Sequence, residues 1–381
     1  MNILIVNWKD PLGPTAGGSE VYVANVAAVW AAQGHDVTLF VPQQSRRAAT
    51  ESVDGVHYVR AGNIHSVFGY SRLFLERQGH RFDVVVESVS VRPFLAHYVV
   101  GERATAVVYH VAREQWNQEK RFPINWMGRR LLEPGWLRRL MTGRVVAISE
   151  STASDLELHG IRPIAIVPPG CSIDTPVTPR SLKSPPRLAF VGRLMQYKKP
   201  ADAVRAFQQV RAVFPGATLD IIGAGYLLDS LRADRAPGVH VHGYLPEPEK
   251  QALLAETDLL LLPGTREGWG IVATEAAAHG TPVVAYDIPG LRDAVDDGRT
   301  GVLVDRTPEA LARAATALLR DSQTWAAMSA AAQDAARRHT WERTADALLA
   351  ACTGSARVEL TGSGLAHTPE HGDRTDVAGV A

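Results

Sequence analysis

The chain has 381 residues, of which 46% are hydrophobic and 21% charged, a composition typical of a globular protein large enough for two domains. Forty basic side chains balance forty acidic ones, so the overall charge offers no attraction to nucleic acid, and we expect no nucleic-acid partner. The two cysteines, Cys171 and Cys352, are too few for a disulfide framework and lack the spacing of a metal site.

The first eight residues lack the basic residues and the long apolar stretch of a signal peptide and are typical of a buried strand. No apolar run approaches the roughly 18 residues that cross a bilayer, and we expect a cytoplasmic protein. In the first half, a helix is predicted at residues 20–33, ended by Gly34. Apolar runs predict strands at residues 3–7, 36–40, 84–86, 106–109, 145–148 and 164–167.

A Pro/Ser-rich stretch at residues 178–186 predicts a linker, after which the same pattern begins again. Strands are predicted at residues 187–191, 218–222, 239–242, 259–262, 282–285 and 301–304. Helices are predicted between them, at residues 200–213, 226–233, 248–255 and 271–279. From Gly354 onward the sequence loses its periodicity, so residues 354–381 are expected to form a flexible tail.

Apolar strands that alternate with helices predict parallel sheets covered by helices on both faces. Two such blocks, residues 1–178 and 185–339, predict an α/β protein with two Rossmann-like, doubly wound domains that face a central cleft. In sheets of this kind, ligands bind at the carboxyl ends of the strands. The motifs that follow these strands are therefore the candidates for a functional site.

The first candidate motif is Gly17-Gly18, after the first strand and at the start of the first helix. Adjacent glycines let the backbone approach a ligand closely, and the free N–H groups of a helix start suit a phosphate. The alternative is an ordinary turn with Ser19 as the N-cap of the helix. The motif is not a dinucleotide fingerprint, because no G-x-G-x-x-G follows the strand.

The second motif contains Arg193 and Lys198, between the first strand and first helix of the second block. Two cations over the cleft can neutralise a diphosphate leaving group. The arginine offers a planar fork of donors and the lysine a mobile point charge. The alternative is a solvated basic loop.

The third motif contains Glu267, in a glycine-rich loop, and Glu275, eight positions later in the following helix. Eight helical residues span about 12 Å, so one carboxylate can reach a hexose and the other the ribose of the same nucleotide sugar. As an alternative, Glu275 is an ordinary surface residue, but its alanine neighbours favour a tightly packed helix. The phosphate between the carboxylates can be held by backbone N–H groups at Gly268, Gly270, Ile271 and Val272.

Together and in this order, the motifs resemble the retaining GT-B glycosyltransferases of family 4 (glycosyl transferases group 1) over roughly residues 1–350. The resemblance is carried by residues 266–276, 280–293 and 297–304, with further similarity at residues 146–152 and 167–170. It implies that Glu267 lies near the donor sugar and that Glu275 holds the ribose. It also implies that Arg193 and Lys198 bind the diphosphate and that Gly17-Gly18 forms the N-terminal glycine loop.

His110, at the end of a predicted strand, resembles the family histidine near the donor sugar. It can hydrogen-bond a sugar hydroxyl or stabilise the reacting centre without being the base that deprotonates the acceptor. The alternative is a packed histidine in a turn. The sequence departs from the family at Lys199, where glycine is usual, and at residues 289–293, where Pro-Gly-Leu-Arg-Asp replaces Gly-Gly-x-x-Glu. We expect these changes to tune donor contacts rather than abolish activity.

The chain contains no Asp-x-Asp sequence, which metal-dependent transferases use to hold a cation on the diphosphate. Arg193, Lys198 and helix N-termini can replace that cation, so we predict metal independence and no cofactor. The resemblance implies retention of the anomeric configuration. It also implies a final helix, residues 340–352, that crosses back to the first domain and joins the acceptor-binding domain to the donor-binding domain.

Residues 113–144 combine eight basic side chains with three tryptophans, Trp116, Trp126 and Trp136. This stretch either binds an anionic acceptor or an anionic membrane surface, or it is a solvated helix pair whose tryptophans lie in the core. The partners expected are a nucleotide sugar donor and a small-molecule, glycan or lipid-linked acceptor. Cell-surface glycan and natural-product assembly both fit, and the base and the sugar of the donor stay open.

Three other functions fit parts of the pattern. A non-catalytic nucleotide-sugar-binding protein would bind the donor without transfer, and a GT-B epimerase would convert its nucleotide sugar without an acceptor. A pyridoxal-phosphate phosphorylase would carry a Schiff-base lysine. A nicotinamide oxidoreductase fits least, because its phosphate fingerprint is missing.

Overall fold

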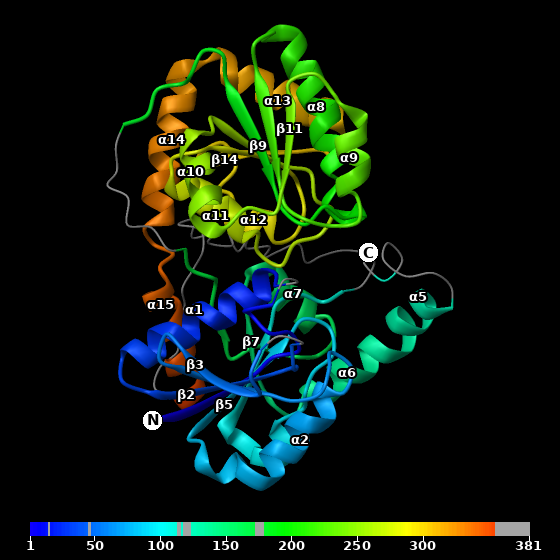
Figure 1. The fold of residues 1–381 in the computed structure, drawn as a ribbon, viewed down its shortest axis with the longest axis vertical. Helices are drawn as coiled ribbons and strands as arrows, with labels where there is room; N and C mark the ends of the chain where they lie inside the picture. Colours follow the sequence, from blue (N-terminus) through cyan, green and yellow to red (C-terminus); the bar gives the residue numbers. More distant parts are fainter. Residues whose placement is uncertain (14–15, 45–46, 113–115, 117–122, 172–178, 355–381) are drawn as a thin grey trace, which may run out of the picture.

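The computed structural model describes residues 1–354 except 14–15, 45–46, 113–115, 117–122 and 172–178. The chain forms two α/β units that lie one above the other along the long axis of the molecule (Figure 1), as the sequence predicts. The predicted tail at residues 354–381 lies outside the described residues, apart from Gly354. No helix in the described part of the chain combines the length and the apolarity that spanning a bilayer would require.

The N-terminal unit contains, within the described residues, a sheet of eight strands in the order β3-β4-β2-β1-β5-β6-β7-β8. Every neighbouring pair is parallel except β3 with β4. The strands are β1 (Asn2–Val6), β2 (Asp36–Val41), β3 (Thr50–Val53), β4 (Val56–Arg60), β5 (Val84–Val89), β6 (Ala104–Val108), β7 (Arg144–Ala147) and β8 (Ala165–Ile166). The hairpin β3–β4 was not predicted, because its polar, partly exposed residues lack the continuous apolar run of a buried strand.

The C-terminal unit contains six strands in its described part, in the order β11-β10-β9-β12-β13-β14. This order, third-second-first-fourth-fifth-sixth along the chain, is that of a doubly wound sheet, and its switch point lies between β9 and β12. The strands are β9 (Arg187–Val191), β10 (Thr218–Ile222), β11 (Val239–Gly243), β12 (Leu259–Leu262), β13 (Val283–Tyr286) and β14 (Gly301–Val304). Each overlaps a strand predicted from the sequence.

Helices cover both sheets. The N-terminal unit has α1 (Gly18–Ala32), α2 (Val67–Gln78), α3 (His97–Val100), α5 (Ile124–Met127), α6 (Glu133–Leu140) and α7 (Glu150–Glu157). The C-terminal unit has α8 (Pro200–Val213), α9 (Leu228–Asp234), α10 (Glu247–Glu256), α11 (Ile271–Ala278), α12 (Leu291–Ala294), α13 (Pro308–Arg320) and α14 (Ser322–Ala336). The helices α2, α3, α7, α12, α13 and α14 were not among the predicted elements.

The last helix, α15 (Trp341–Thr353), leaves the C-terminal unit and packs on the N-terminal one (Figure 1). The indole Nε1 of Trp30 in α1 donates to the carbonyl of Ala345 at 3.0 Å, and Trp341 lies in the same apolar core as Tyr22. Gly170 passes this helix so closely that a Cβ there would lie 2.4 Å from the Trp341 backbone nitrogen. The chain therefore crosses between the units twice, in adjacent segments.

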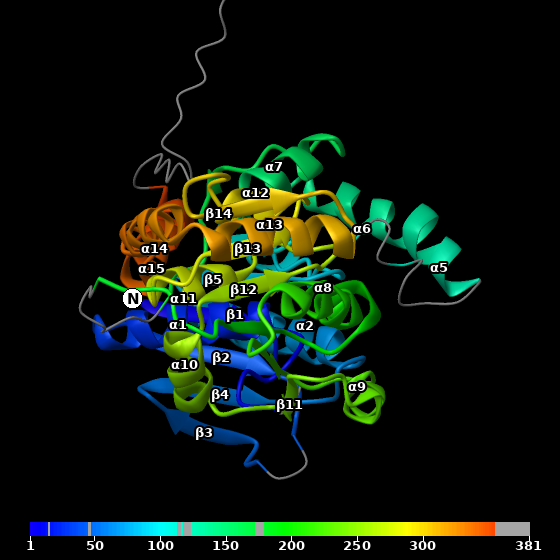
Figure 2. The same cartoon turned by 90° about the horizontal axis from the view of Figure 1, so that it is seen from above.

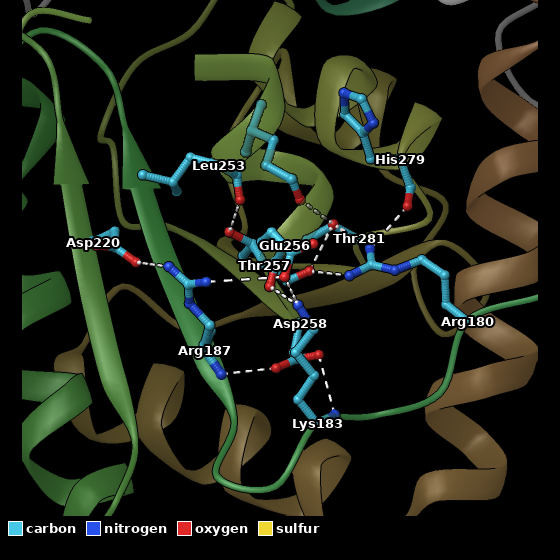
Figure 3. A network of polar contacts seen from close by, with 11 residues as sticks. Arg180, Lys183, Arg187, Asp220, Leu253, Glu256, Thr257, Asp258, His279 and Thr281 are labelled. Atoms are coloured by element: carbon cyan, nitrogen blue, oxygen red, sulfur yellow. Dashed lines mark hydrogen bonds and ion pairs between the residues drawn. The ribbon is translucent and has the colours of Figure 1, made fainter. Parts of the chain in front are cut away.

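The predicted linker is anchored on the C-terminal unit through Arg180 (Figure 3). Its guanidinium donates to the carbonyl of His279 at 2.8 Å and to that of Thr257 at 2.7 Å. Asp258 accepts from the backbone N–H groups of Lys183 and Arg187. Residues 180–187 are thus tied to the amino ends of β9 and β12, the two central strands of the C-terminal sheet, which fixes where the second unit begins.

An arm formed by α5, a π-helical turn (Gly128–Leu132) and α6 projects from the N-terminal unit (Figures 1 and 2). Of the three tryptophans in this stretch, Trp126 is 51% exposed, whereas Trp116 and Trp136 are half-buried. Trp116 packs over Gly128, and its Nε1 donates to Glu133. The interpretation that places all three tryptophans in the core is therefore wrong for Trp126.

Candidate active site

A cavity of about 390 Å³ lies between the two units, at the carboxyl ends of β1, β6 and β9. Both units contribute the carboxyl ends of their strands to this cavity, and these are the ends at which parallel sheets bind ligands. All the site residues predicted from the sequence line this one cavity: Gly17, Gly18, His110, Arg193, Lys198, Glu267, Gly268, Gly270, Ile271, Val272 and Glu275. Residues up to 258 positions apart are brought together by the fold.

The glycine loop forms the N-terminal wall of the cavity. Glu20 is buried, and its carboxylate accepts from the N–H of Gly17 at 2.9 Å and from Asn7 at 3.3 Å. Helix α1 begins at Gly18 with Gly17 as N-cap, so Ser19 is not the cap, and its hydroxyl donates to Glu20 instead. A Cβ on Gly18 would meet only the Ile271 side chain, at 3.6 Å, so the start of the helix stays open to a ligand.

Arg193 and Lys198 lie in the connection from β9 to α8. Arg193 hydrogen-bonds the hydroxyl of Tyr197 and lies over its ring, with 5.5 Å from Cζ to the ring centroid. Lys198 donates to Oε1 of Glu267. Lys199 adopts a left-handed backbone with φ of 53°. That conformation explains why glycine is usual there in the family, since a residue with a Cβ costs about 1–2 kcal/mol in it.

The backbone around Glu267 packs closely against two other segments of the chain. A Cβ on Gly290, which has φ of 85°, would lie 2.4 Å from the carbonyl oxygen of Glu267, and one on Gly268 would lie 2.2 Å from that of Tyr109. Asp293, in place of the family glutamate, accepts from the Gly290 N–H at 3.0 Å. The same carboxylate accepts from the N–H of Ser151 at 3.2 Å, which links α12 to the start of α7 in the other unit.

Glu275 lies on α11 and bonds to Lys250 of α10, with 2.8 Å between Oε2 and Nζ. The side chains of Glu275 and Lys250 are only 12% and 16% exposed. Burial raises the pKa of Glu275, and the charge of Lys250 opposes this rise. Burial lowers the pKa of Lys250, but its contacts with Glu275 and Glu247 outweigh burial, so the pKa is raised overall.

Two further residues of the cavity, Lys9 and Lys250, were not predicted from the sequence. Lys9 follows β1 and lies 4.5 Å from the Trp8 ring centroid. Burial lowers its pKa, as does the nearby charge of Arg193, while Glu20 opposes. Its place directly after the first strand was a usable signal. Lys250 gave none, because it meets Glu275 only through the packing of two helices 25 residues apart.

Two contacts join the walls of the cavity. Trp269, from the loop of Glu267, is buried in the core of the N-terminal unit with Tyr22 and Tyr109. Arg266 pairs with Asp155 of α7 at 3.3 Å, and both side chains are less than a fifth exposed. The loop of Glu267 is therefore packed against both units. Among the described residues, no group of three His, Cys, Asp or Glu side chains is arranged to hold a metal ion.

Comparisons with known proteins give the same picture along most of the chain. The family model for "Glycosyltransferase Family 4" matches residues 16–175, and that for "Glycosyl transferases group 1" matches residues 185–321. A glycogen synthase of Mycobacterium tuberculosis is 29% identical over 386 residues, with 91% of each chain covered. A D-inositol 3-phosphate glycosyltransferase of Arthrobacter sp. is 30% identical over 385 residues, covering 88% of this chain and 90% of the relative.

Solved structures agree on the fold. Sucrose-phosphate synthase from Thermosynechococcus elongatus superposes with a TM-score of 0.73 at 17% identity, over 93% of this chain and 100% of that one. Anabaena HepE in complex with UDP-glucose gives a TM-score of 0.70 at 16% identity, again over 93% and 100%. At these identities the superpositions establish the two-unit GT-B architecture.

Proposed function

The chain belongs to the glycosyltransferases of family 4 (glycosyl transferases group 1), and from that premise we propose that it moves a hexose-type sugar from a nucleoside diphosphate to an acceptor hydroxyl. The transfer retains the anomeric configuration and needs no metal ion. One observation carries the proposal: the lining of a single cavity includes the cations Arg193 and Lys198 together with the carboxylates Glu267 and Glu275. A nucleotide sugar has a dianionic centre and a hydroxyl-bearing ring at each end, which is the pattern these four groups complement.

In the proposed reaction, the acceptor oxygen forms a bond to the anomeric carbon while the bond from that carbon to the diphosphate oxygen breaks. The leaving oxygen keeps the electron pair and takes the acceptor's proton on the same face. Arg193, Lys198 and the N–H groups at the start of α1 stabilise the charge that develops on the diphosphate. Glu267 and His110 orient the donor sugar, which supplies the positioning part of the rate enhancement. Glu267 as a covalent nucleophile is less favoured, because its carboxylate is bonded to Lys198.

A thermal-shift screen against UDP-, GDP-, ADP- and dTDP-sugars tests the proposal. A donor at 100 times its Kd stabilises the fold by about 2.7 kcal/mol, so the correct one raises Tm by about 3 °C for a chain of 381 residues. The selected donor is then incubated with the enzyme, and release of the nucleoside diphosphate is measured with and without acceptors. If no nucleotide sugar shifts Tm or is turned over, the proposal is wrong.

The same assay separates the two alternatives. A non-catalytic binding protein shifts Tm but releases no nucleoside diphosphate with any acceptor. An epimerase changes the sugar of the donor without an acceptor. The cationic pair alone does not distinguish the three functions, because it stabilises a bound diphosphate in each of them, so the acceptor-dependent release of nucleoside diphosphate decides.

Metal independence is tested with EDTA. Turnover in excess EDTA should equal turnover in magnesium, because protein cations carry out the charge stabilisation. Complete loss in EDTA, restored by magnesium or manganese, would reject this part of the proposal.

The names of the two relatives, which refer to glycogen and to D-inositol 3-phosphate, support a glycan or a small polyhydroxy acceptor.

The projecting arm supports a third class, a lipid-linked acceptor. On the arm, Ile124, Met127 and Leu131 are exposed and spaced three and four residues apart, which places them on one helical face. Arg129 and Arg130, also exposed, lie beside them.

We propose that this arm touches an anionic membrane from the cytoplasmic side, where cell-surface glycan or natural-product assembly takes place. Sedimentation with vesicles of phosphatidylglycerol and phosphatidylcholine tests this, and binding should weaken in high salt. The double variant Trp126→Ser/Leu131→Ser should lose binding. Leu158→Ser, which changes a 75% exposed leucine outside the arm, should bind normally. No sedimentation at low salt would exclude the membrane contact.

A further inference from the structure

Lys250, a cation in the lining of the cavity, joins two carboxylates of different exposure. Its Nζ lies 2.8 Å from Oε2 of Glu275 and 2.9 Å from Oε1 of Glu247. Glu275 is 12% exposed and lines the cavity, whereas Glu247 is 65% exposed and lies outside it. Within the part of the chain that the structure describes, these two carboxylates take two of the three N–H donors of the ammonium group.

The position of Lys250 and Glu275 within the cavity indicates which part of the donor they contact. Lys198 and Glu267 lie together in the connection after β9 and the loop after β12, whereas Lys250 and Glu275 lie on α10 and α11. Glu267 lies in the loop before α11, whereas Glu275 lies in the second turn of that helix, so the two carboxylates line the cavity from different elements. In the proposed function Glu267 holds the donor sugar and Glu275 the ribose, which places the Lys250–Glu275 pair at the nucleoside end.

We propose that Lys250 is a positioning residue for nucleoside recognition: it binds Oε2 of Glu275 and so directs Oε1 of that carboxylate toward the ribose hydroxyls. This inference rests on the proposed nucleotide-sugar function. Its physical basis is that an ionised carboxylate only accepts hydrogen bonds, whereas the protonated form also donates one and loses acceptor strength. Two ribose hydroxyls that both donate need the ionised form.

Electrostatics support the need for a partner. Burial raises the pKa of Glu275, since a carboxylate with little solvent around it is poorly stabilised, and Glu247 raises it further. Lys250 opposes both through its charge and its hydrogen bond. Without the ammonium group, the carboxyl would take up a proton at a higher pH than it does now. Ribose binding would then become sensitive to pH, with affinity lost as the pH falls.

The test is calorimetric titration of UDP, GDP and ADP, and of their 2′-deoxy counterparts, at pH 6, 7 and 8. The wild-type protein should prefer the ribonucleotide it recognises by about tenfold or more, since a hydrogen bond to a charged group has that worth. The ratio of its affinities for the ribonucleotide and the deoxyribonucleotide should change little with pH, because the terminal phosphate, with a pKa of about 6, titrates equally in both. Lys250→Met should reduce this ribose preference to less than about threefold, and the preference should fall further as the pH is lowered from 8 to 6.

Three further variants keep the result interpretable. Lys250→Arg should restore most of the ribose preference, because it retains the charge and a donor. Glu247→Gln should leave the preference intact, because it removes only the exposed partner. Lys183→Met removes a lysine of the same unit that pairs with the exposed Glu256 and does not line the cavity, and it should bind like the wild type.

The outcomes separate this inference from the function on which it rests. If the wild type binds a nucleotide but Lys250→Met keeps both its ribose preference and a flat pH profile, the role of Lys250 is wrong and the proposed function stands. If the wild type binds none of the six nucleotides and no nucleotide sugar of the thermal-shift screen, both fall. A uniform loss of affinity in Lys250→Met for ribo- and deoxyribonucleotides alike would show a structural effect and would also reject the inference. Should Lys250→Met fail to fold, Lys250→Gln replaces it with the same expectations.

Discussion

Two lysine–carboxylate pairs lie in the same cavity and differ in what supports them. Lys198 with Glu267 is 18% and 15% exposed, and Lys250 with Glu275 is 16% and 12% exposed, so solvent does not distinguish them. Glu267 lies on an irregular loop between β12 and α11, whereas Glu275 lies within α11 among buried alanines. The first pair is held by close backbone contacts and the second by helix packing.

This difference teaches how one cavity can combine chemistry with recognition. The loop of Glu267 touches both units, through Trp269 in the N-terminal core and through Arg266 with Asp155. A change in the relative position of the units would therefore move Glu267. Glu275 and its lysine both belong to the C-terminal unit and would move together. We call Lys198 with Glu267 the loop pair and Lys250 with Glu275 the helix pair. We expect changes at the loop pair to alter turnover and changes at the helix pair to alter affinity.

The largest effect is expected from Glu267→Gln. The substitution keeps the size of the side chain but removes the charge beside the donor sugar and the partner of Lys198. Turnover should fall about 10³-fold, the upper range for loss of one preorganised electrostatic contact, while the Kd of the nucleoside diphosphate changes less than threefold. Release of nucleoside diphosphate from the donor measures turnover. Near-full turnover would exclude any essential role for this carboxylate.

Lys198→Met should follow, with a loss of about 10²-fold in turnover, because one of two cations that stabilise the leaving diphosphate is removed. Lys198→Arg should recover part of it, since charge matters more than shape for a point contact. Lys199→Met changes the neighbouring lysine, which has no place in the lining of the cavity, and it should retain turnover. Equal losses at both positions would mean that general basicity of the loop, rather than Lys198, is responsible.

Gly290→Ala tests the backbone support of the loop pair. The added Cβ would lie 2.4 Å from the Glu267 carbonyl oxygen, at a residue with φ of 85°. We expect a stability loss of more than 2 kcal/mol, of which the left-handed backbone contributes about 1–2 kcal/mol, and a fall in turnover of about tenfold. Gly298→Ala is the matched control, because φ is 76° but nothing lies within 4 Å of its Cβ. Similar effects in both variants would show that strain alone, not contact with Glu267, is at work.

The comparison also shows what the sequence could predict. Lys198 and Glu267 were each identified from local motifs, because glycines, cations and carboxylates follow recognisable strands in the correct order, but their contact with each other was not predicted. Lys250 was not found, since its meeting with Glu275 depends on how α10 packs on α11. The role of Asp293 was hidden for the same reason: its carboxylate caps α12 and reaches Ser151 in the other unit, a contact no local pattern encodes.

The fold was predicted best where strands are buried on both faces. In the C-terminal unit every predicted strand overlaps an observed one, because runs such as 259–262 are continuously apolar. In the N-terminal unit the hairpin of β3 and β4 escaped prediction, since its alternating and partly exposed residues resemble loop sequence. The exposure of Trp126 was left open by the sequence, because a tryptophan in a basic stretch is compatible with core or surface.

The smallest effect concerns stability at the helix pair, and its sign is informative. Burial raises the pKa of Glu275 above the ordinary value of 4.5. A carboxyl that binds its proton more tightly when folded destabilises the fold as the pH rises from about 4.5 through the raised pKa. Glu275→Gln carries no such charge, but it also loses the ion pair with Lys250. The difference in stability between wild type and variant should therefore move in favour of the variant as the pH increases from 5 to 8.

Calorimetry of both proteins across this range measures that difference, while affinity for the nucleoside diphosphate should fall about tenfold in the variant. Glu256→Gln provides the opposite case, because a hydrogen bond from Lys183 lowers the pKa of this exposed glutamate. The stability that Glu256 contributes is present above about 4.5 and is lost as the pH falls, so its curve should slope the other way. If Glu275→Gln followed the Glu256 pattern, the ion pair with Lys250 would outweigh burial. Glu275 would then contribute to stability as much as to binding. The Lys250–Glu275 pair could no longer be assigned to recognition alone, in contrast to the Lys198–Glu267 pair, which is assigned to the reaction.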